Sequence, residues 1–338
     1  MGGGEFIDFD TTRKHRSHSS GVFGAVSADT FTKVGHSRSV STDLLPALGS
    51  KIRTVRCFHK HPIVCILDVT GSMGDAVFII YEKLGTFFIQ IENQGYLDDP
   101  AVSFAAVGDC YCDSAPLQVA DFSQSMELVE NLEKMYIEHG GGGQHHESYE
   151  TMLYYYWKHC ELPDAETPFL FIIGDEGFYD TVSKDHLRRW LGEKEAREVD
   201  SREVIRQLLR KFAGNVFLLH LDYRTPLLDG EIVAQWREVL GENLIHLTDP
   251  TLVVEVMLGL IAMTMNRRTM TSYLDDFRYL YTADRLRAAN PGPNDVNERV
   301  HSMRQMLTPY SQSINALAKV EMDGALPGAG AGTTRRRG

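Results

Sequence analysis

The sequence has a shortage of positive charge and lacks several common catalytic motifs. Its 34 lysines and arginines stand against 46 aspartates and glutamates, which gives a formal net charge of −12. A general nucleic-acid binder presents a basic face, so this balance argues against nucleic acid as a partner. The sequence contains neither a GxxxxGK(S/T) phosphate-binding loop nor a GxSxG nucleophile elbow. Two frequent hydrolase designs are therefore excluded.

Cysteine is scarce, and its spacing matches no metal site. The five cysteines form no CxxC pair and no zinc spacing. Most of them lie in apolar runs, so we interpret them as small buried side chains in a reducing compartment. His145 and His146 are adjacent, but no second cluster completes a tetrahedral zinc site. We interpret these two histidines as solvated or capping residues.

Long apolar segments are also missing. The first thirty residues contain no apolar core of the kind found in signal peptides. The most apolar stretch, LVVEVMLGLIAM at 252–263, is too short to cross a bilayer and carries Glu255. We therefore expect a cytoplasmic protein without a membrane partner.

Strand-like and helix-like segments alternate through the middle of the chain. Short apolar runs such as PIVCIL (62–67) and TPFLFIIGDE (167–176) predict buried strands, and apolar residues at helical spacing follow them. Buried strands separated by amphipathic helices indicate a mainly parallel sheet covered on both faces. The predicted fold class is a doubly wound α/β domain. We interpret the charged segment 183–203 as a surface helix inserted into it.

Segments of different composition flank this domain. The N-terminal region, 1–58, begins rich in Ser, Thr, Gly, Arg and His, and we expect an arm that is partly extended or disordered. Thr308 followed by Pro309 is typical of a helix start, which predicts two short helices near the C-terminus rather than one. The α/β domain is expected over 59–266, a helical extension over 267–320 and a flexible tail over 321–338.

Oxygen-bearing side chains occur where two of the predicted strands end. Asp68, Thr70 and Ser72 alternate directly after the first strand, and Asp175 lies at the end of a later one. In such sheets ligands collect at the carboxyl ends of the strands, so we expect these side chains to meet at one edge. Two carboxylates and two hydroxyls suit Mg²⁺, which demands near-octahedral oxygen coordination and retains several waters.

The order of these motifs resembles the von Willebrand factor A (VWA) domain. DxTxS, a glycine-rich loop that opens a helix, and a buried strand ending in Asp follow one another over about residues 60–265. The family's metal-ion-dependent adhesion site has the pattern DxSxS…T…D. The resemblance implies that Asp68, Thr70, Ser72 and Asp175 hold Mg²⁺, or Mn²⁺ or Ca²⁺ in its place. The loop HGGGGQHHE looks most like intracellular prokaryotic or phage members.

The second loop of the pattern departs from the family. Where the family often has Thr after the glycines, this sequence has Gln144, whose carbonyl oxygen can bind an ion directly or through water. Glu147, at the start of the next helix, is the alternative ligand. Asp109 and Asp113 also follow a predicted strand, and we expect them to support the site or cap a turn rather than bind the ion.

The resemblance also implies a function. VWA domains of this kind use the bound ion to capture an Asp or Glu of a protein partner, which implies an adaptor or assembly factor and not an enzyme. Intracellular relatives often work beside MoxR-type AAA+ ATPases, so such an ATPase is the suggested partner. Two alternatives stay open: a metal-dependent phosphohydrolase, and a structural component of a virion or other large assembly. The hydrolase alternative lacks the second Asp of DxDxT, where Thr70 stands.

Overall fold

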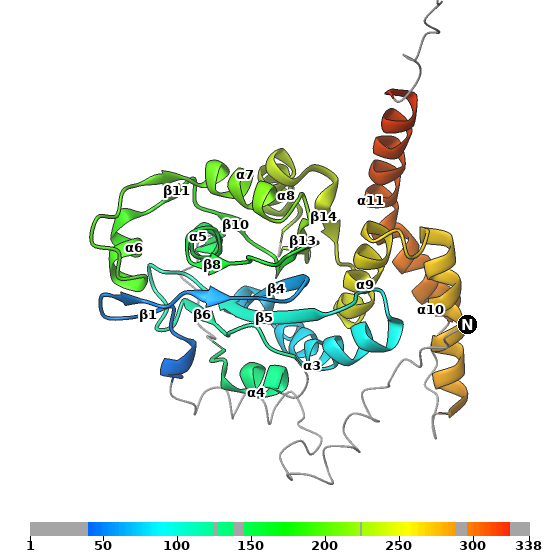
Figure 1. Ribbon diagram of the computed structural model, residues 1–338, viewed down its shortest axis with the longest axis horizontal. Helices are drawn as coiled ribbons and strands as arrows, with labels where there is room; N and C mark the ends of the chain where they lie inside the picture. The colour runs from blue at the N-terminus through cyan, green and yellow to red at the C-terminus, as the bar shows by residue number, and fades with distance from the viewer. Residues whose placement is uncertain (1–39, 125–126, 138–144, 224, 288–295, 325–338) are drawn as a thin grey trace, which may run out of the picture.

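The computed structural model describes residues 40–124, 127–137, 145–223, 225–287 and 296–324 (Figure 1). Within these ranges the chain forms a mixed α/β fold with a mostly parallel central sheet flanked by helices. The prediction of a mainly parallel sheet between helical layers is confirmed as a statement about fold class.

The central sheet has six strands in the order β14-β13-β9-β4-β5-β6. Neighbouring strands are parallel, except that β5 and β6 are antiparallel. Every residue of β9, β4 and β5 is buried, because these apolar strands are covered on both faces. The bounds are β4 (His61–Asp68), β5 (Pro100–Val107), β6 (Leu117–Val119), β9 (Phe169–Gly174), β13 (Val216–His220) and β14 (Leu244–His246).

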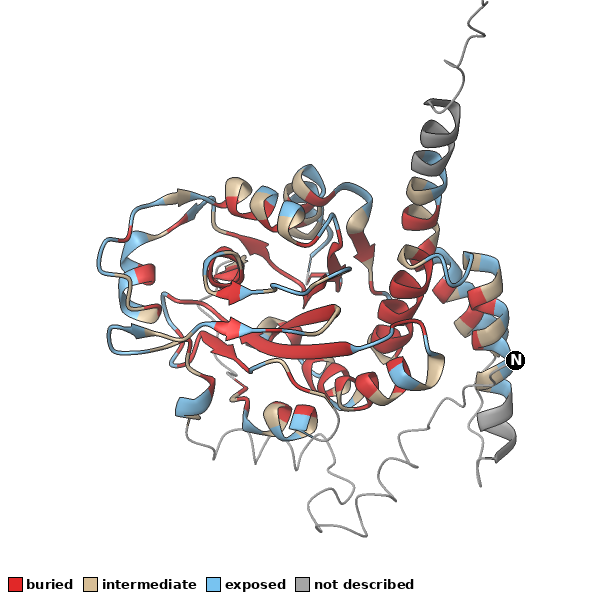
Figure 2. Cartoon of the chain, viewed as in Figure 1, coloured by how far each residue is buried: buried red, intermediate tan, exposed pale blue. Residues whose placement is uncertain are grey.

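Side chains along each strand alternate between two hydrophobic clusters, one on each face of the sheet. In β4, Ile63 and Cys65 belong to one cluster, and Val64 and Ile66 to the other. Figure 2 shows the sheet as a buried layer between partly exposed helices. The first cluster includes residues of α3 (Ala76–Gln94), α4 (Glu127–Lys134), α9 (Val253–Thr264), α10 (Met270–Arg287) and α11 (Val296–Gly324). The second includes residues of α5 (Tyr149–Lys158), α6 (Lys184–Trp190), α7 (Ser201–Lys211) and α8 (Pro226–Leu240).

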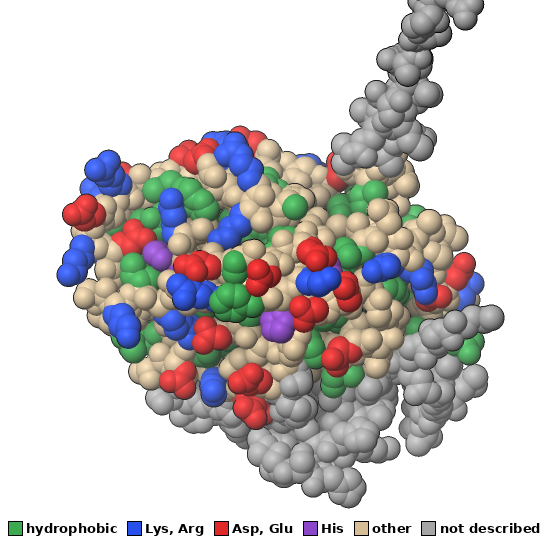
Figure 3. Space-filling view, in the orientation of Figure 1, with side chains coloured by type: hydrophobic (Ala, Val, Ile, Leu, Met, Phe, Trp, Pro, Cys, Tyr) green, Lys and Arg blue, Asp and Glu red, His purple; other side chains and the backbone are tan. Residues whose placement is uncertain are grey.

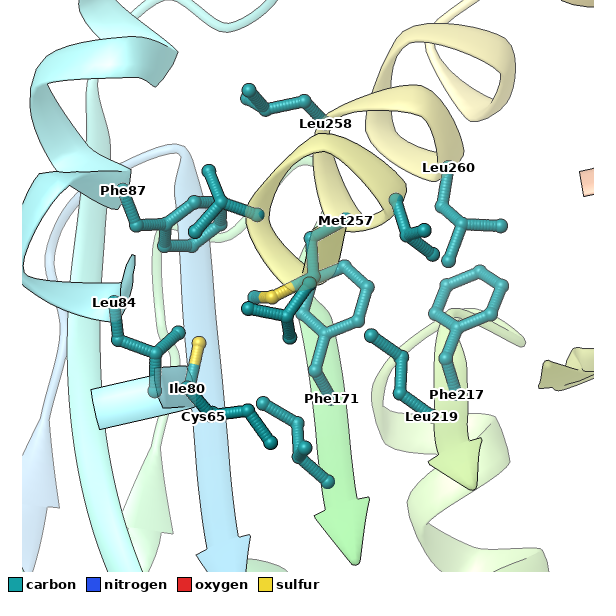
Figure 4. Packing of buried hydrophobic residues seen from close by; sticks show 14 of the residues in the cluster. Cys65, Ile80, Leu84, Phe87, Phe171, Phe217, Leu219, Met257, Leu258 and Leu260 are labelled. Atoms are coloured by element: carbon teal, nitrogen blue, oxygen red, sulfur yellow. The ribbon is translucent and has the colours of Figure 1, made fainter. Parts of the chain in front are cut away.

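Helix α9 contains the most apolar segment of the chain and packs on the sheet. Figure 4 shows Met257 and Leu260 of α9 directed towards Phe171 and Phe217 of the strands. Every α9 residue from 253 to 263 is buried, so its apolar character is explained by the core. None of the helices in the described ranges has the length and apolarity that a membrane span requires.

The C-terminal helices differ from the sequence prediction. Two short helices separated at Pro309 were expected, and this is wrong, because α11 runs through Pro309 without interruption. Met303 and Tyr310 are buried on either side of it, so tertiary packing outweighs the helix-breaking tendency of proline. The Thr308 hydroxyl donates to the Arg304 carbonyl at 2.6 Å, a local hydrogen bond in the turn where Pro309 has no N–H.

Short strands tie the remaining segments to the domain. Strand β3 (Val55–Arg56) pairs in parallel with β8 (Cys160–Glu161), and β7 (His146–Glu147) pairs in parallel with β10 (Gly177–Phe178). The other two-residue strands are β1 (Ala47–Leu48), β2 (Lys51–Ile52), β11 (Thr181–Val182) and β12 (Val199–Asp200). Short 3₁₀ helices span Thr42–Leu44, Gly71–Met73, Gly241–Asn243 and Pro250–Leu252.

The charged insert also differs from its prediction. Instead of one helix over 183–203, the chain forms the short helix α6 and then β12, which pairs antiparallel with β11. Gly192, just after α6, has a φ of 73°. A Cβ there would lie 2.4 Å from the Gly49 carbonyl oxygen, so only glycine suits this close approach of two backbones. The helix ends here because the chain must turn back against the 47–52 hairpin.

Candidate metal centre

The first predicted loop forms a tight turn at the carboxyl end of β4. Asp68 is the last residue of β4, and its Oδ1 accepts hydrogen bonds from the Thr70 amide at 2.9 Å and the Thr70 hydroxyl at 2.5 Å. A 3₁₀ turn begins at Gly71, and Ser72 Oγ lies 3.1 Å from Thr70 Oγ1. The alternating oxygens of the DxTxS motif are therefore side by side.

The third predicted loop begins at the neighbouring strand. Strands β4 and β9 are parallel and in register, so Asp68 and Gly174 end their strands at the same level. Asp175 follows Gly174, and its Oδ1 accepts a hydrogen bond from the Ser72 hydroxyl at 2.9 Å. Hydrogen bonds therefore join four of the five predicted ligands: Asp68, Thr70, Ser72 and Asp175.

Three of these four side chains, Asp68, Thr70 and Asp175, are buried, and Ser72 is partly exposed. The exposed fraction is 0% for Asp68 and 3% for Asp175. Burial raises the pKa of Asp68 above its ordinary value, and the hydrogen bonds from Thr70 and Tyr149 oppose that shift in part. A buried carboxylate is costly unless a positive charge pairs with it or a proton neutralises it. A divalent cation at this edge would supply the missing charge.

The second predicted loop lies partly outside the described residues. Gln144 is among the residues not described, and its role as a ligand stays a prediction. Glu147, the alternative, is 3% exposed, and no described residue gives its Oε2 a hydrogen bond. Burial, followed by the charges of Asp68 and Glu176, raises the pKa of Glu147 to about 11. At neutral pH Glu147 therefore keeps its proton, and it lies beside Asp68 as a further carboxyl group that a bound cation could ionise and use as an oxygen ligand.

The donor set fits a hard divalent cation better than zinc. Carboxylate and hydroxyl oxygens suit Mg²⁺, Mn²⁺ and Ca²⁺, whereas structural zinc prefers Cys and His. Among the described residues, no group of three or more His, Cys, Asp and Glu side chains is arranged to hold a metal. An ion here would thus depend on the hydroxyls and on water as much as on carboxylates. In the same part of the chain no lysine or arginine is buried, so the acidic edge has no buried lysine or arginine beside it.

Asp109 and Asp113 build the loop that follows β5. Asp113 Oδ2 accepts the Asp109 amide at 2.7 Å, and Asp109 Oδ1 accepts the Tyr111 amide at 3.1 Å. Gly108 makes room for this turn, because a Cβ there would lie 2.4 Å from Asp113 Oδ2. The Ser148 hydroxyl, at the start of α5, donates to Asp109 Oδ1 at 3.3 Å. The two carboxylates therefore cap a turn and tie it to α5, whereas support of an ion site by them stays a prediction.

The two adjacent histidines pack against tyrosines. His145 Nδ1 lies 3.2 Å from the Tyr223 hydroxyl, and the His146 ring stacks on Tyr179 with centroids 5.4 Å apart. His146 begins β7, whose partner β10 starts two residues after Asp175. Both histidines are partly exposed, so their interpretation as solvated or capping residues stays a prediction, to which the structure adds the contacts with tyrosines.

Sequence reasoning missed one residue of the site, Tyr149. Its fully buried hydroxyl donates to Asp68 Oδ2 at 2.5 Å. Gly174 makes room for it, because a Cβ at that position would lie 1.9 Å from Tyr149 Oη. The ring packs edge-on against Trp236 with centroids 5.6 Å apart, and Trp236 Nε1 donates to the Glu176 carbonyl at 2.9 Å. In the sequence Tyr149 is simply one of the apolar residues at helical spacing in 149–157. The only sequence signal for its position is Gly174 in IIGDE, because a glycine in a buried strand can mark a place where another side chain packs against the backbone.

Surface charges of the described residues are mixed in sign. On the face shown in Figure 3, lysines and arginines lie among aspartates and glutamates. Several form exposed ion pairs, such as Arg56 with Glu161 at 2.7 Å and Arg202 with Asp180 at 2.6 Å. Exposed pairs of this kind contribute little to stability.

Comparison with known proteins gives only distant similarity. No protein-family model matches the sequence, and no curated protein matches it. The pilus adhesin SpaC from Lactobacillus rhamnosus GG is similar in structure, with a TM-score of 0.40 and 10% identity over 68% of this chain and 32% of that one. Proximal thread matrix protein 1 from the mussel byssus has a TM-score of 0.41 and 8% identity over 62% and 49%. The chain spans less than half the length of either protein, and these values assign neither family nor function.

Proposed function

We propose that this chain is a metal-dependent protein-binding module, an adaptor or assembly factor that captures an acidic side chain of a partner. The observation that carries the proposal is the hydrogen-bonded group of Asp68, Thr70, Ser72 and Asp175. Ser72 and Asp175 are 103 positions apart in the sequence, yet their side chains are in direct contact at the carboxyl edge of the sheet. Mg²⁺ is the proposed ion, with Mn²⁺ or Ca²⁺ able to take its place.

Each side chain has its own part in the proposed site. Asp68 and Asp175 provide negative charge, and the Thr70 and Ser72 hydroxyls provide neutral oxygens. Gln144 or Glu147 completes the set from the glycine-rich loop. When bound, the ion offers a positive centre to which a carboxylate oxygen of the partner binds in exchange for water. Because the hydroxyls cancel none of the ion's charge, they preserve its attraction for that carboxylate.

We propose, from the order of its motifs, that the chain is a VWA domain and that a MoxR-type AAA+ ATPase in the cytoplasm is its associate. The binding function is preferred over phosphohydrolase activity for a specific reason. A DxDxT hydrolase has a second Asp at the position of Thr70, and here the Thr70 hydroxyl donates to the Asp68 carboxylate at 2.5 Å. Asp68 Oδ1 is thus held by the turn itself and is poorly placed to act as a nucleophile.

Calorimetric titration with MgCl₂ tests the metal site. We expect one ion per chain for the wild type and an affinity reduced at least about tenfold in Ser72→Ala. Ser103→Ala is the matched control, since its buried hydroxyl donates to the Ala120 carbonyl at 2.7 Å and contacts none of the four ligands. Absence of Mg²⁺ binding by the wild type, or equal affinities for both variants, would contradict the proposal.

Affinity capture from cell extract, with identification by mass spectrometry, tests the binding function. The wild type should retain a protein in Mg²⁺ and release it in EDTA, and Asp68→Ala should not retain it although circular dichroism shows the variant folded. Retention that is indifferent to chelation and to Asp68→Ala would instead favour the structural-component alternative. Turnover of a phosphoester by the wild type, lost in Asp68→Ala, would favour the hydrolase.

A further inference from the structure

We propose that a row of four aromatic rings beside the candidate metal centre receives an arginine of the partner. The segment of the partner that binds this chain then carries an arginine within a few residues of its acidic side chain. The inference rests on the proposed function and adds a second contact to it. The aromatic row consists of His146, Tyr179, Tyr111 and His186.

The rings of the aromatic row come from segments that are distant in the sequence. The His146 ring, from the start of β7, stacks on Tyr179 with centroids 5.4 Å apart. Tyr111, in the loop after β5, lies 5.0 Å from the Tyr179 ring and 4.3 Å from the ring of His186 in α6. Tyr111 is 57% exposed, and Tyr179 and His146 are partly exposed. The fold therefore gathers a continuous aromatic row that a partner can reach.

The aromatic row begins at the candidate metal centre. His146 directly precedes Glu147, and Tyr111 follows Gly108 by three residues. A Cβ at Gly108 would lie 3.5 Å from Thr70 Cγ2, so Gly108 is next to the first ligand loop. Three residues of chain span at most about 11 Å, which bounds the distance from Gly108 to Tyr111. An extended partner segment rises about 3.3 Å per residue and covers that distance with about three or four residues.

The carboxylate of Asp109 lies against the aromatic row. Its Oδ2 accepts the Tyr179 hydroxyl at 3.2 Å, and its Oδ1 accepts the Tyr111 amide at 3.1 Å and the Ser148 hydroxyl at 3.3 Å. All three partners donate, which is the pattern of an ionised carboxylate. Asp109 is 1% exposed, and within the described ranges no lysine or arginine pairs with it. Its negative charge is therefore not cancelled by a basic side chain of the described structure.

This combination of rings and charge favours a cation over an apolar or acidic side chain. A cation is attracted to the face of an aromatic ring, and the attraction is stronger where negative charge lies behind the ring. Burial lowers the pKa of His186, so its ring carries no positive charge at neutral pH that would repel the ligand. An acidic side chain would be repelled by Asp109, and an apolar one would gain nothing from it.

Arginine fits this surface better than lysine. Its planar guanidinium stacks on aromatic rings and is less strongly hydrated than an ammonium group, so it loses less on leaving water. The chain already forms a contact of this kind in α6, where the Arg189 guanidinium lies 4.5 Å from the centroid of the Trp190 ring. The proposed contact would repeat that arrangement with an arginine supplied by the partner.

A purely structural role for the aromatic row makes a different prediction. If the rings only pack α6 against the domain, they affect stability and have no influence on the sequence of a bound partner. If they receive an arginine, the charge of that arginine contributes to affinity only while the Tyr111 ring is present. The comparison of a charged and an uncharged ligand on two variants separates the two roles, because general effects on the fold cancel.

The first step of the test is selection from a random peptide library displayed on phage. The full chain is immobilised in Mg²⁺, and bound phage are released with EDTA. We expect the released peptides to share an Asp or Glu and an arginine at a constant spacing. Peptides that share the acid but no arginine at a fixed position would overturn the inference and leave the proposed function intact. Absence of any peptide whose binding requires Mg²⁺ and Asp68 would contradict the proposed function as well.

The second step is calorimetric titration with a selected peptide, made with arginine and with citrulline in its place, which has nearly the same shape but no charge. On the wild type, citrulline should weaken binding about fivefold, the scale of a partly exposed cation–π contact. Tyr111→Phe keeps the ring and should keep this factor, as should Tyr279→Ala, which removes a 74% exposed tyrosine of α10. In Tyr111→Ala the two peptides should bind equally. The same fivefold factor in Tyr111→Ala would overturn the inference, although Mg²⁺-dependent binding of both peptides would still support the proposed function.

Discussion

Glu150 provides a quantitative test of how buried acids near the sheet edge affect stability. It is 1% exposed, and its carboxyl group accepts the Thr151 hydroxyl at 2.8 Å and the Tyr179 amide at 3.3 Å. Burial is the largest effect on this group and raises its pKa from 4.5 to about 8, although the hydrogen bonds oppose the shift. At neutral pH the folded protein therefore keeps a proton that the unfolded chain has released.

This difference in proton binding fixes the sign of the pH dependence. Below 4.5 both states are protonated, and above about 8 both are ionised, so the change falls between these two values. Within this window the folded state binds more protons, and the free energy of unfolding decreases as pH rises. The limiting slope is about 1.4 kcal/mol per pH unit, or about 3 kcal/mol over two units. Glu150→Gln preserves the shape of the side chain and removes this contribution.

Urea unfolding in EDTA measures the effect. We compare the wild type and Glu150→Gln at about pH 5.5 and about pH 7.5, both inside the window. Groups common to the two proteins cancel in the comparison, so the stability advantage of Glu150→Gln should grow by up to about 3 kcal/mol between the two pH values. An advantage that is the same at both pH values would refute the reasoning, because it would mean that Glu150 has an ordinary pKa in the fold.

Two further predictions concern the group of four and its surroundings. Mg²⁺ at about 100 times its dissociation constant should stabilise the wild type by about 2.7 kcal/mol and raise its Tm by several degrees in calorimetry. An equal rise of Tm in Asp68→Ala would contradict the proposal that Asp68 helps to bind the ion. Gly174→Ala should lower the free energy of unfolding by about 2 kcal/mol, because the new Cβ would overlap the Tyr149 hydroxyl. Gly85→Ala, in α3 with nothing within 4 Å of the added Cβ, should instead stabilise by up to about 1 kcal/mol; equal effects of the two changes in urea unfolding would refute the packing argument.

The sheet could be predicted because burial on both faces leaves an unmistakable pattern. PIVCIL lies in β4 and TPFLFIIG contains β9, since strands covered on both sides must be apolar at every position. The meeting of Asp68, Ser72 and Asp175 followed from the same fact, because neighbouring parallel strands end at one edge. That these side chains bind an ion is our proposal and not part of that prediction.

The features that sequence reasoning missed depend on contacts between distant segments. Tyr149 occupies a position that any large apolar residue could fill, and its role requires Asp68 on one strand and a missing Cβ at Gly174 on another. Thr308 and Pro309 were expected to start a second short helix, but the burial of Met303 and Tyr310 keeps α11 continuous. In both cases the local sequence did not determine the structure, because contacts with distant segments decided it.

The central claim is that the carboxyl edge of the sheet holds a divalent cation among the oxygens of Asp68, Ser72 and Asp175. A crystal structure obtained in saturating Mn²⁺, with an anomalous difference map, tests it most directly. We predict one strong anomalous peak in contact with the Ser72 hydroxyl and bounded by the two aspartates, with water on its open side. A map without such a peak, in which the Ser72 hydroxyl still donates to Asp175, would contradict the claim.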